Sequence, residues 1–374
     1  MNRIYQMCSR CILDTSDPDI YFDSEGICNH CHDTARLLAT LPQSHQEEKV
    51  RLSSIATLIK QAKGNNEYDS LLGISGGVDS SYVAYLAKKI GLSPLVVHFD
   101  NGWNSELAVN NINKLVDTLG FDLSTYVIDW EEFKDLQRSF LKASVVDIEL
   151  LTDHAITAAM FHLAHKHKIK FVLSGNNYAT ESGMPGSWVW NKQDKINIIG
   201  IHKRFGTRKM KSFPTLGLWK WIMVSNLGLG FKFVPLLNNA MYKKNEAMKV
   251  IKSDLGWQYY GGKHYESIFT KFYQAYILPE KFGIDKRKVH LSSLIRNEEM
   301  SRDEALEELA KPLYDPIELK NDKVYVLKKL GFSEDEFVKI MNLPPKSHND
   351  YPSSARLLKI LRNTKNILLK LNFL

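Results

Sequence analysis

The segment Ser75–Ser81, with the sequence Ser-Gly-Gly-Val-Asp-Ser-Ser, constrains the fold of this chain more than any other feature. It follows the apolar run Leu71–Ile74, typical of a strand, and precedes Tyr82–Ile90, typical of a helix that ends at Gly91. A strand, a short turn and a helix N-terminus make an anion-binding site, because unpaired N–H groups and the helix dipole point at negative charge. Glycines let the backbone approach a ligand, and serines add hydroxyl donors. The segment therefore predicts an α/β fold with a phosphate-binding loop.

This loop differs from the Walker type, whose pattern Gly-x-x-x-x-Gly-Lys-Ser/Thr does not occur in the chain. The pattern Ser-Gly-Gly-x-Asp-Ser resembles the PP-loop of the ATP pyrophosphatase superfamily. Members of that superfamily bind ATP, transfer AMP to a substrate oxygen and release pyrophosphate. An ordinary Gly-Ser turn is the alternative, but the order of strand, turn and helix favours the phosphate-binding interpretation.

The length of 374 residues predicts two or three domains, and 44% hydrophobic with 24% charged residues is ordinary for a soluble globular protein. The net charge of +7 suits phosphate-bearing ligands but is weak support for nucleic acid. The start of the chain, Met1–Gln6, is not followed by the apolar stretch of a signal peptide, so we expect a cytoplasmic protein.

The most apolar long window is 216–237, which holds two lysines and a proline and so argues against a membrane-spanning helix. A buried or partner-facing segment is the simpler interpretation. Its tryptophans and phenylalanines beside lysines also suit peripheral membrane contact.

All four cysteines lie near the start of the chain, as Cys8-x-x-Cys11 and Cys28-x-x-Cys31. Two such pairs are typical of a zinc ribbon, in which four thiolates bind one tetrahedral ion and leave no open position for a substrate. Disulfides or a redox Cys-x-x-Cys are the alternatives, and nothing marks the protein as secreted. The sequence therefore predicts a structural zinc site.

Alternating strands and helices from about residue 68 to 205 predict a Rossmann-like parallel sheet. We expect further strands at Ser93–Phe99, Leu123–Ile128 and Ile169–Leu173, and a helix at His154–Lys168 with Asp153 as its cap. After residue 205 the alternation is lost and the chain looks mostly helical. The predicted domains are a zinc module and linker (1–45), a PP-loop domain (46–205) and a mostly helical substrate- or partner-binding region (206–374).

Polar loops follow the expected strands, and ligands of open α/β sheets bind outside the carboxyl ends of strands. These loops, Asp100–Trp103 and Ser174–Asn177, together with Glu181, therefore predict one shared site. In the helical region, the turn Tyr259–Glu266 and the basic cluster Asp285–His290 carry side chains suited to phosphate, base catalysis or Mg²⁺. For the basic cluster, a solvated helix face is an equal alternative.

Beyond the PP-loop, the chain resembles the N-acetyl sugar amidotransferases of the WbpG and PseA type. The resemblance rests on the cysteine pairs, on Asp100–Glu106 and Asp153–Ile156, and on Gly261–Ser267 and Asp285–Ser292. At the fourth strand, relatives carry an acidic Gly-Glu-Asn pattern, whereas Ser174-Gly175-Asn176 lacks that glutamate.

The resemblance implies that ATP adenylates the carbonyl oxygen of a sugar acetamido group and that ammonia then displaces AMP, giving an acetamidino group. It implies ATP, Mg²⁺ and structural Zn²⁺ as cofactors and a nucleotide-linked N-acetyl sugar as substrate. A glutaminase of the cysteine type needs a free thiol, and none remains here, so the resemblance implies separate glutaminase and ammonia-channelling, cyclase-like subunits. No nucleic acid partner is expected.

The residues assigned to these roles fall into four groups. The expected catalytic residues are Asp79, Lys263, Glu266, Lys286 and Arg287. The expected cofactor-binding residues are Ser75, Gly76, Gly77, Asp79, Ser80, Ser81, Asp100, Asn101, Gly102, Gly175 and Asn176. The expected substrate-binding residues are Trp103, Asp153, His154, Glu181, His264 and His290, and the expected metal ligands are Cys8, Cys11, Cys28 and Cys31.

Two other functions fit parts of the sequence. Some tRNA-thiolating enzymes of the superfamily combine zinc ribbons with a PP-loop, but here no cysteine remains for sulfur transfer once zinc is bound. A zinc-ribbon scaffold that only binds nucleotide is the second alternative, and the intact PP-loop argues against it.

Overall fold

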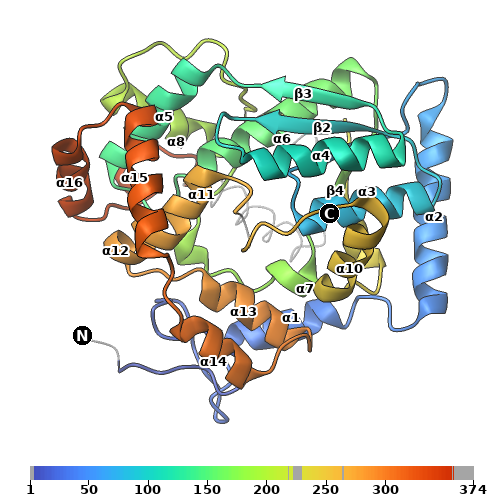
Figure 1. The fold of residues 1–374 in the computed structure, drawn as a ribbon, viewed down its shortest axis with the longest axis horizontal. Coiled ribbons are helices and arrows are strands. Elements are labelled where there is room, and N and C mark those ends of the chain that lie inside the picture. Colours follow the sequence, from blue (N-terminus) through green and yellow to red (C-terminus); the bar gives the residue numbers. More distant parts are fainter. Residues whose placement is uncertain (1–3, 218, 222–229, 263–264, 356, 358–374) are drawn as a thin grey trace, which may run out of the picture.

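The computed structural model of the protein describes residues 4–217, 219–221, 230–262, 265–355 and 357 (Figure 1). Its centre is a five-stranded parallel sheet of order β3-β2-β1-β4-β5. The strands are β1 (Ser70–Ile74), β2 (Pro94–Asp100), β3 (Leu123–Val127), β4 (Phe171–Ser174) and β5 (Lys232–Pro235). The Rossmann-like parallel sheet predicted from the sequence is confirmed. From β1, successive strands are added first on one side (β2, β3) and then on the other (β4, β5). Open α/β sheets bind their ligands at such a switch point, here between β1 and β4.

Helices join the strands and form the rest of the chain. Those of the first half are α1 (Asn29–Leu38), α2 (His45–Lys63), α3 (Val78–Lys89), α4 (Glu106–Leu119), α5 (Trp130–Ala143), α6 (Leu150–Lys166), α7 (Tyr178–Glu181) and α8 (Lys195–Phe205). Those of the second half are α10 (Lys244–Leu255), α11 (Ile268–Phe272), α12 (Leu278–Phe282), α13 (Arg287–Arg296), α14 (Arg302–Ala310), α15 (Pro316–Leu330) and α16 (Glu334–Asn342). Short turns are η1 (Gly186–Trp188), η2 (Leu236–Asn239), the π-helical η3 (Tyr273–Ile277) and η4 (His348–Asp350). The second half is mostly helical, as predicted.

Both faces of the sheet are covered, because successive strand residues point to opposite sides. Leu72, Ile74 and Val96 pack with α2, α3, α4 and α10 on one face. Leu71, Leu95 and Val97 pack with α6 on the other face. Burial on both faces explains why these strands read as continuous apolar runs in the sequence.

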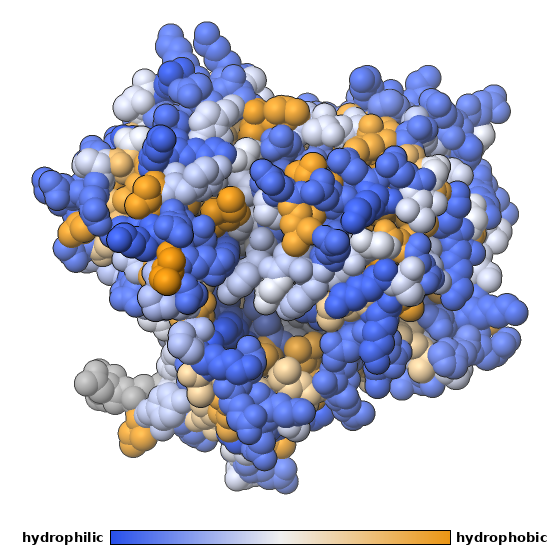
Figure 2. Space-filling view, viewed as in Figure 1, coloured by the Kyte–Doolittle hydropathy of each residue, from blue (hydrophilic) through white to orange (hydrophobic). Residues whose placement is uncertain are grey.

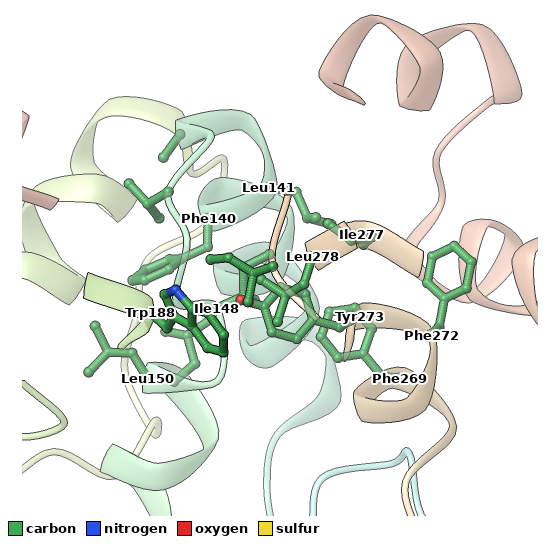
Figure 3. Packing of buried hydrophobic residues seen from close by; sticks show 14 of the residues in the cluster. Phe140, Leu141, Ile148, Leu150, Trp188, Phe269, Phe272, Tyr273, Ile277 and Leu278 are labelled. Atoms are coloured by element: carbon green, nitrogen blue, oxygen red, sulfur yellow. The ribbon is translucent and has the colours of Figure 1, made fainter. Parts of the chain in front are cut away.

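A larger core joins α5 to the helices of the second half. Phe140 of α5, Trp188 of η1 and Tyr273 of η3 meet there with aliphatic side chains (Figure 3). The same cluster continues to the four cysteines. The zinc module is therefore packed into the molecule rather than suspended from it.

Two local expectations need correction. Helix α6 begins at Leu150, so Asp153 lies inside its first turn and the N-cap is Glu149. Strand β5 was not expected, because Lys232–Pro235 is short and shows no alternation; it pairs with β4 in parallel. Helix α14 begins with a capping box, in which Ser301 and Glu304 bond each other's backbone N–H groups.

The window 216–237 lies partly outside the described residues. In its described part, Trp219 and Phe233 are exposed and Phe231 is buried against α6. Among the described residues, none of the helices is both long and apolar enough to cross a bilayer.

Candidate active site

The carboxyl ends of β1, β2 and β4 border a cavity of about 350 Å³, which we call the main cavity. Figure 2 shows the molecule hollowed near the middle of the same view as Figure 1. Sequence-predicted residues from four separate segments line this cavity: Ser75, Gly77, Asp79, Ser80, Asn101, Gly175, Asn176, Glu181 and Glu266. Three carboxylates and the N-terminus of α3 therefore face one space, as nucleotide and Mg²⁺ binding require.

The PP-loop connects β1 to α3 and is held by its own serines. The Ser75 N–H donates to Ser80 Oγ (3.3 Å), and the Gly77 N–H donates to Ser75 Oγ (3.3 Å). Gly76 has a φ of +81°, and a Cβ there would lie 2.7 Å from the carbonyl oxygen of Ala108 on α4. Only glycine fits this position without displacing the loop.

The adjacent β4 loop also lies close to the PP-loop. A Cβ on Gly175 would lie 3.2 Å from the backbone nitrogen of Ser80. Gly76 contacts the second half of the chain as well, since its carbonyl accepts a hydrogen bond from Trp257 Nε1 (2.8 Å). The loop is thus enclosed on several sides before any ligand binds.

Tyrosines from the second half complete the site, and the sequence analysis did not assign them. The Tyr242 hydroxyl donates a hydrogen bond to Asp79 Oδ1. Burial, together with the Asp79 carboxylate, raises the pKa of Tyr242 well above its usual value, so it stays a donor. A Cβ on Gly77 would lie 3.1 Å from the Tyr260 hydroxyl oxygen and 3.6 Å from Glu266 Oε1. Residues almost two hundred positions away in the sequence thus border the phosphate-binding turn.

The loop after β2 contributes fewer residues than predicted. Asn101 lines the main cavity, whereas Asp100 accepts a hydrogen bond from the Gly102 N–H (2.8 Å) and shapes the turn. Trp103 is only 1% exposed and donates from Nε1 to Gln137 (2.9 Å), so it belongs to the core. The cavity wall instead includes His98 and Asn104, whose side chains lie 3.2 Å apart.

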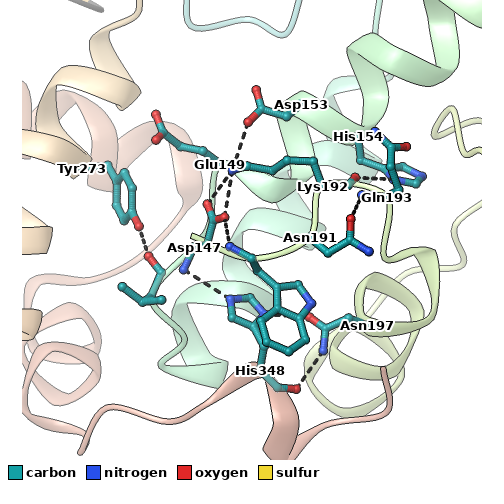
Figure 4. Close-up of polar contacts among 12 residues, drawn as sticks. Asp147, Glu149, Asp153, His154, Asn191, Lys192, Gln193, Asn197, Tyr273 and His348 are labelled. Atoms are coloured by element: carbon teal, nitrogen blue, oxygen red, sulfur yellow. Dashed lines mark hydrogen bonds and ion pairs between the residues drawn. The ribbon is translucent and has the colours of Figure 1, made fainter. Parts of the chain in front are cut away.

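Asp153 and His154, near the start of α6, belong to a polar network and not to the wall of the main cavity (Figure 4). His154 is fully buried, with Nδ1 bonded to the Lys192 carbonyl (2.9 Å) and Nε2 accepting from the Leu216 N–H (3.2 Å). Lys192 pairs with Asp153 (3.0 Å) and Asp147 (2.8 Å). Burial alone would lower the pKa of Lys192, but these carboxylates outweigh it and raise the pKa. Asp153 and His154 therefore hold the chain here in place.

The basic cluster near residue 286 also has partners away from the main cavity. Lys286 is buried and pairs with Glu149 (2.8 Å). Arg287 pairs with Asp285 (2.8 Å) and donates to the Lys311 carbonyl (2.7 Å).

Some of the other predicted site residues are also absent from the cavity wall formed by the described residues. These are Gly76, the buried Ser81, Asp100, Gly102 and His290 of α13. Lys263 and His264 lie outside the described residues, although Gly262 beside them lines the cavity. Lys244 also lines it, a cation that the sequence analysis did not single out.

The four cysteines form a separate, buried cluster in which all Sγ atoms lie within 4.8 Å of one another. Cys8 Sγ accepts backbone N–H groups of Cys11 (3.4 Å) and Cys28 (3.2 Å). The nearby His30 and His32 are bonded to Asp17 and Asp23 (2.8 Å each), which leaves the thiols as the donor set. Four converging thiols fit a closed tetrahedral zinc site, where zinc would hold two segments of the module together.

Comparisons with known proteins match both halves of the chain. The asparagine synthase family model matches residues 60–177, and the model of the C-terminal domain of LPS biosynthesis protein WbpG-like proteins matches residues 266–365. No curated protein sequence matches the chain.

Among solved structures, the chain is similar to the NMN synthetase from Francisella tularensis, with 18% identity and a TM-score of 0.29. That match covers 35% of this chain and 56% of that chain. The NH3-dependent NAD synthetase from Campylobacter jejuni subsp. jejuni gives 16% identity, a TM-score of 0.28 and coverage of 35% and 58%. The chain thus spans somewhat more than half the length of these structures. The two family models, one over residues 60–177 and one over residues 266–365, support a WbpG-type amidotransferase family for this chain.

Proposed function

We propose that the protein converts the acetamido group of a nucleotide-linked N-acetyl sugar to an acetamidino group, in the biosynthesis of lipopolysaccharide or a related surface sugar. One observation carries the proposal: both matched regions form a single cavity. Ser75 and Asp79 come from the asparagine synthase match, and Glu266, Ser267 and Thr270 come from the WbpG-like match. The PP-loop, which would carry out adenylation, thereby faces residues of the region that matches the WbpG-like C-terminal domain.

The chemistry follows from the weakness of an amide carbon as an electrophile. The acetamido oxygen attacks the α-phosphorus of ATP, the bond to the β-phosphate breaks, and pyrophosphate leaves. Ammonia then forms a C–N bond at the activated carbon, the C–O bond to AMP breaks, and AMP leaves with the electron pair. One proton is released for each ammonium ion consumed.

The residues of the main cavity suit these steps. The N–H groups at the start of α3, with Ser75 and Ser80, would bind the phosphates of ATP. Asp79 and Glu266 are the oxygen donors that would hold Mg²⁺, which neutralises charge on the departing pyrophosphate. Apolar side chains of β2 and α6, including Val97 and Met160, offer a wall for the adenine base.

The source of ammonia is part of the proposal. All four cysteines belong to the buried cluster, so the chain has no thiol for a cysteine-type glutaminase. We therefore propose a separate glutaminase with an ammonia-channelling subunit, and cytoplasmic location with them. Ammonium salts should replace both partners in vitro, whereas glutamine alone should not support turnover.

A product assay tests the function directly. Purified protein is incubated with ATP, Mg²⁺, ammonium and a panel of UDP- and CMP-linked N-acetyl sugars, and AMP, pyrophosphate and sugar mass are measured together. Exchange of one acetamido oxygen for NH, in equal amounts with AMP and pyrophosphate, would support the proposal. An Asp79→Ala variant is the control, and formation of ADP and phosphate would contradict adenylation.

A further inference from the structure

A second cavity of about 510 Å³ adjoins the main cavity at the end of β4. The two cavities share four wall residues, Ser174, Asn176, Glu181 and Phe233. The rest of the second wall comes from α7, from the start of η2, and from Leu37 of α1 in the zinc module. The shared residues make the two cavities neighbouring parts of one site.

The charge of the second cavity differs from that of the first. Glu181 is the charged side chain in its described wall, and the other polar side chains carry hydroxyls or amides: Ser174, Asn176, Asn177, Tyr178, Ser182 and Asn238. The described wall contains no lysine, arginine or histidine. The Glu181 carboxylate repels anions, and the described wall has no cationic side chain to offset it. Pyrophosphate and AMP are therefore less suited to this cavity than a small cation is.

The wall of this cavity is fixed in place by its own hydrogen bonds. Asn177 Oδ1 accepts from the Thr180 N–H (2.8 Å) and so caps α7, which carries Glu181. Asn238 Oδ1 accepts from the Tyr178 N–H (2.9 Å) and ties α7 to η2. Ser174 and Asn176 of this wall flank Gly175, where a Cβ would lie 3.2 Å from Ser80 N, and Glu181 shares the wall of the main cavity with the PP-loop. A reactant held at Glu181 is therefore beside the loop that binds the phosphates.

We propose that the second cavity is the access route and binding site for ammonium, with the Glu181 carboxylate as its charge partner. This inference rests on the proposed function, in which ammonia is the second substrate. The ammonium ion loses one proton to solvent, and the nitrogen lone pair of the resulting ammonia attacks the carbon of the adenylylated acetamido group. Leu37 and Phe233, 36% and 42% exposed, form an apolar part of the cavity wall where an ammonia-delivering subunit could dock.

A charge-reversal pair at the mouth tests the route. Leu37→Lys should raise the apparent KM for ammonium about threefold, and Leu37→Glu should lower it, because a partly screened charge acts on the entering cation. The KM for ATP should stay constant. The substitutions Ala35→Lys and Ala35→Glu are the matched control, because Ala35 is exposed on α1 but is not part of the cavity wall. Equal KM values for ammonium in the two Leu37 variants would overturn the route.

Two further measurements separate this inference from the proposed function. The exchange of labelled pyrophosphate into ATP in the presence of a sugar measures adenylation and needs no ammonium. If no sugar of the panel supports this exchange, the result counts against the proposed function and does not test the ammonium site. Thallium(I), a cation of similar size to ammonium, reports the site without turnover when soaked into crystals of the full chain. Anomalous density beside Glu181 that disappears in Glu181→Gln would support the site, and no density there would overturn it.

Discussion

At the scale of single residues, the candidate site depends on groups that hold the PP-loop from outside. Asp79 is oriented by Tyr242, and Gly77 is flanked by Tyr260 and Glu266. These contacts fix the carboxylate and the loop before ATP arrives. Such preorganisation matters because reacting groups must stay within a fraction of an ångström of their working positions.

Tyr242→Phe should lower the rate of sugar-dependent pyrophosphate release about tenfold, since a hydrogen bond to a charged group contributes roughly 1.5–3 kcal/mol. The protein should still fold, because the ring remains packed against Tyr82. Tyr85→Phe, on the other side of the Tyr82 ring, serves as the control and should keep the full rate. An unchanged rate in Tyr242→Phe would show that Asp79 does not need this contact.

Gly76→Ala should abolish measurable ATP binding and lower the midpoint of thermal unfolding. The new methyl group would meet the Ala108 carbonyl oxygen at 2.7 Å, at a φ of +81° that costs non-glycine residues about 1–2 kcal/mol. Gly186→Ala is the matched control, because a Cβ there would have no heavy atom within 4 Å. Calorimetric titration with ATP distinguishes the two variants, and normal affinity in Gly76→Ala would contradict the loop geometry.

The PP-loop residues could be predicted because their chemistry lies within one local motif. The roles of Trp103 and Lys286 could not, since each depends on a distant partner: Gln137 for the indole and Glu149 for the ammonium group. Tyr242 gave no local signal, because a tyrosine in a loop is common and only the tertiary fold brings it to Asp79.

At the scale of elements, a buried histidine joins the end of the described chain to the start of α6. His348 of η4 bonds Asn197 Oδ1 through Nδ1 (2.7 Å) and accepts the Asp147 N–H at Nε2 (3.3 Å). Its ring stacks on that of Trp190, with the ring centroids 5.0 Å apart. A proton on Nε2 would face another donor, so this arrangement fits the neutral ring only. Burial lowers the pKa of His348 to about 4.

The fold should therefore lose stability as the pH falls from about 6.5, the ordinary histidine pKa, towards 4. The unfolded state binds a proton in that range and the folded state does not, so the stabilisation is present above 6.5 and lost below. The loss attributable to His348 is about 3 kcal/mol. Thermal unfolding measured between pH 7 and 4 should show a shallower decline in His348→Gln than in the natural protein. Parallel declines would exclude this histidine as the cause.

The position of β1 was predicted well, because an apolar run ends directly at the glycines of the PP-loop. Strand β5 escaped prediction because its four residues include an exposed lysine and a proline, and pairing with the edge of β4 defines it. Helix α6 starts earlier than expected because the apolar pair Leu150–Leu151 already packs in the core.

At the scale of the whole molecule, the segment that carries the cysteines contacts both α7 and the helices of the second matched region. Arg302 donates to the carbonyls of Cys8 and Cys11 (3.3 Å each), and Lys288 pairs with Asp14 (2.5 Å). Helix α1 also packs on α7 and α13. Arg296 of α13 in turn donates to the Ser182 carbonyl (2.9 Å), next to Glu181. The four-cysteine cluster is thus linked to a wall of the candidate site.

We expect about one zinc ion per chain by metal analysis, and its removal by a chelator should lower the midpoint of thermal unfolding by about 5 °C or more. Cys11→Ser should have the same effect, because three thiols no longer complete the tetrahedron. His32→Ala is the control and should retain zinc, since that histidine pairs with Asp23. A metal-free protein with unchanged unfolding would refute a structural zinc.

The position of β5 has a consequence for how the protein is made. The edge of β4 is complete once Ser174 is synthesised, but its neighbour ends only at Pro235. At bacterial elongation rates of about 5–20 residues per second, the ribosome needs several seconds to deliver that strand. During this interval the nascent chain carries an open, apolar sheet edge, the kind of surface that invites pairing with other chains. The nucleotide-binding half therefore cannot close its own sheet until the second half has begun to emerge, which ties the two halves together during biosynthesis as well as in the finished enzyme.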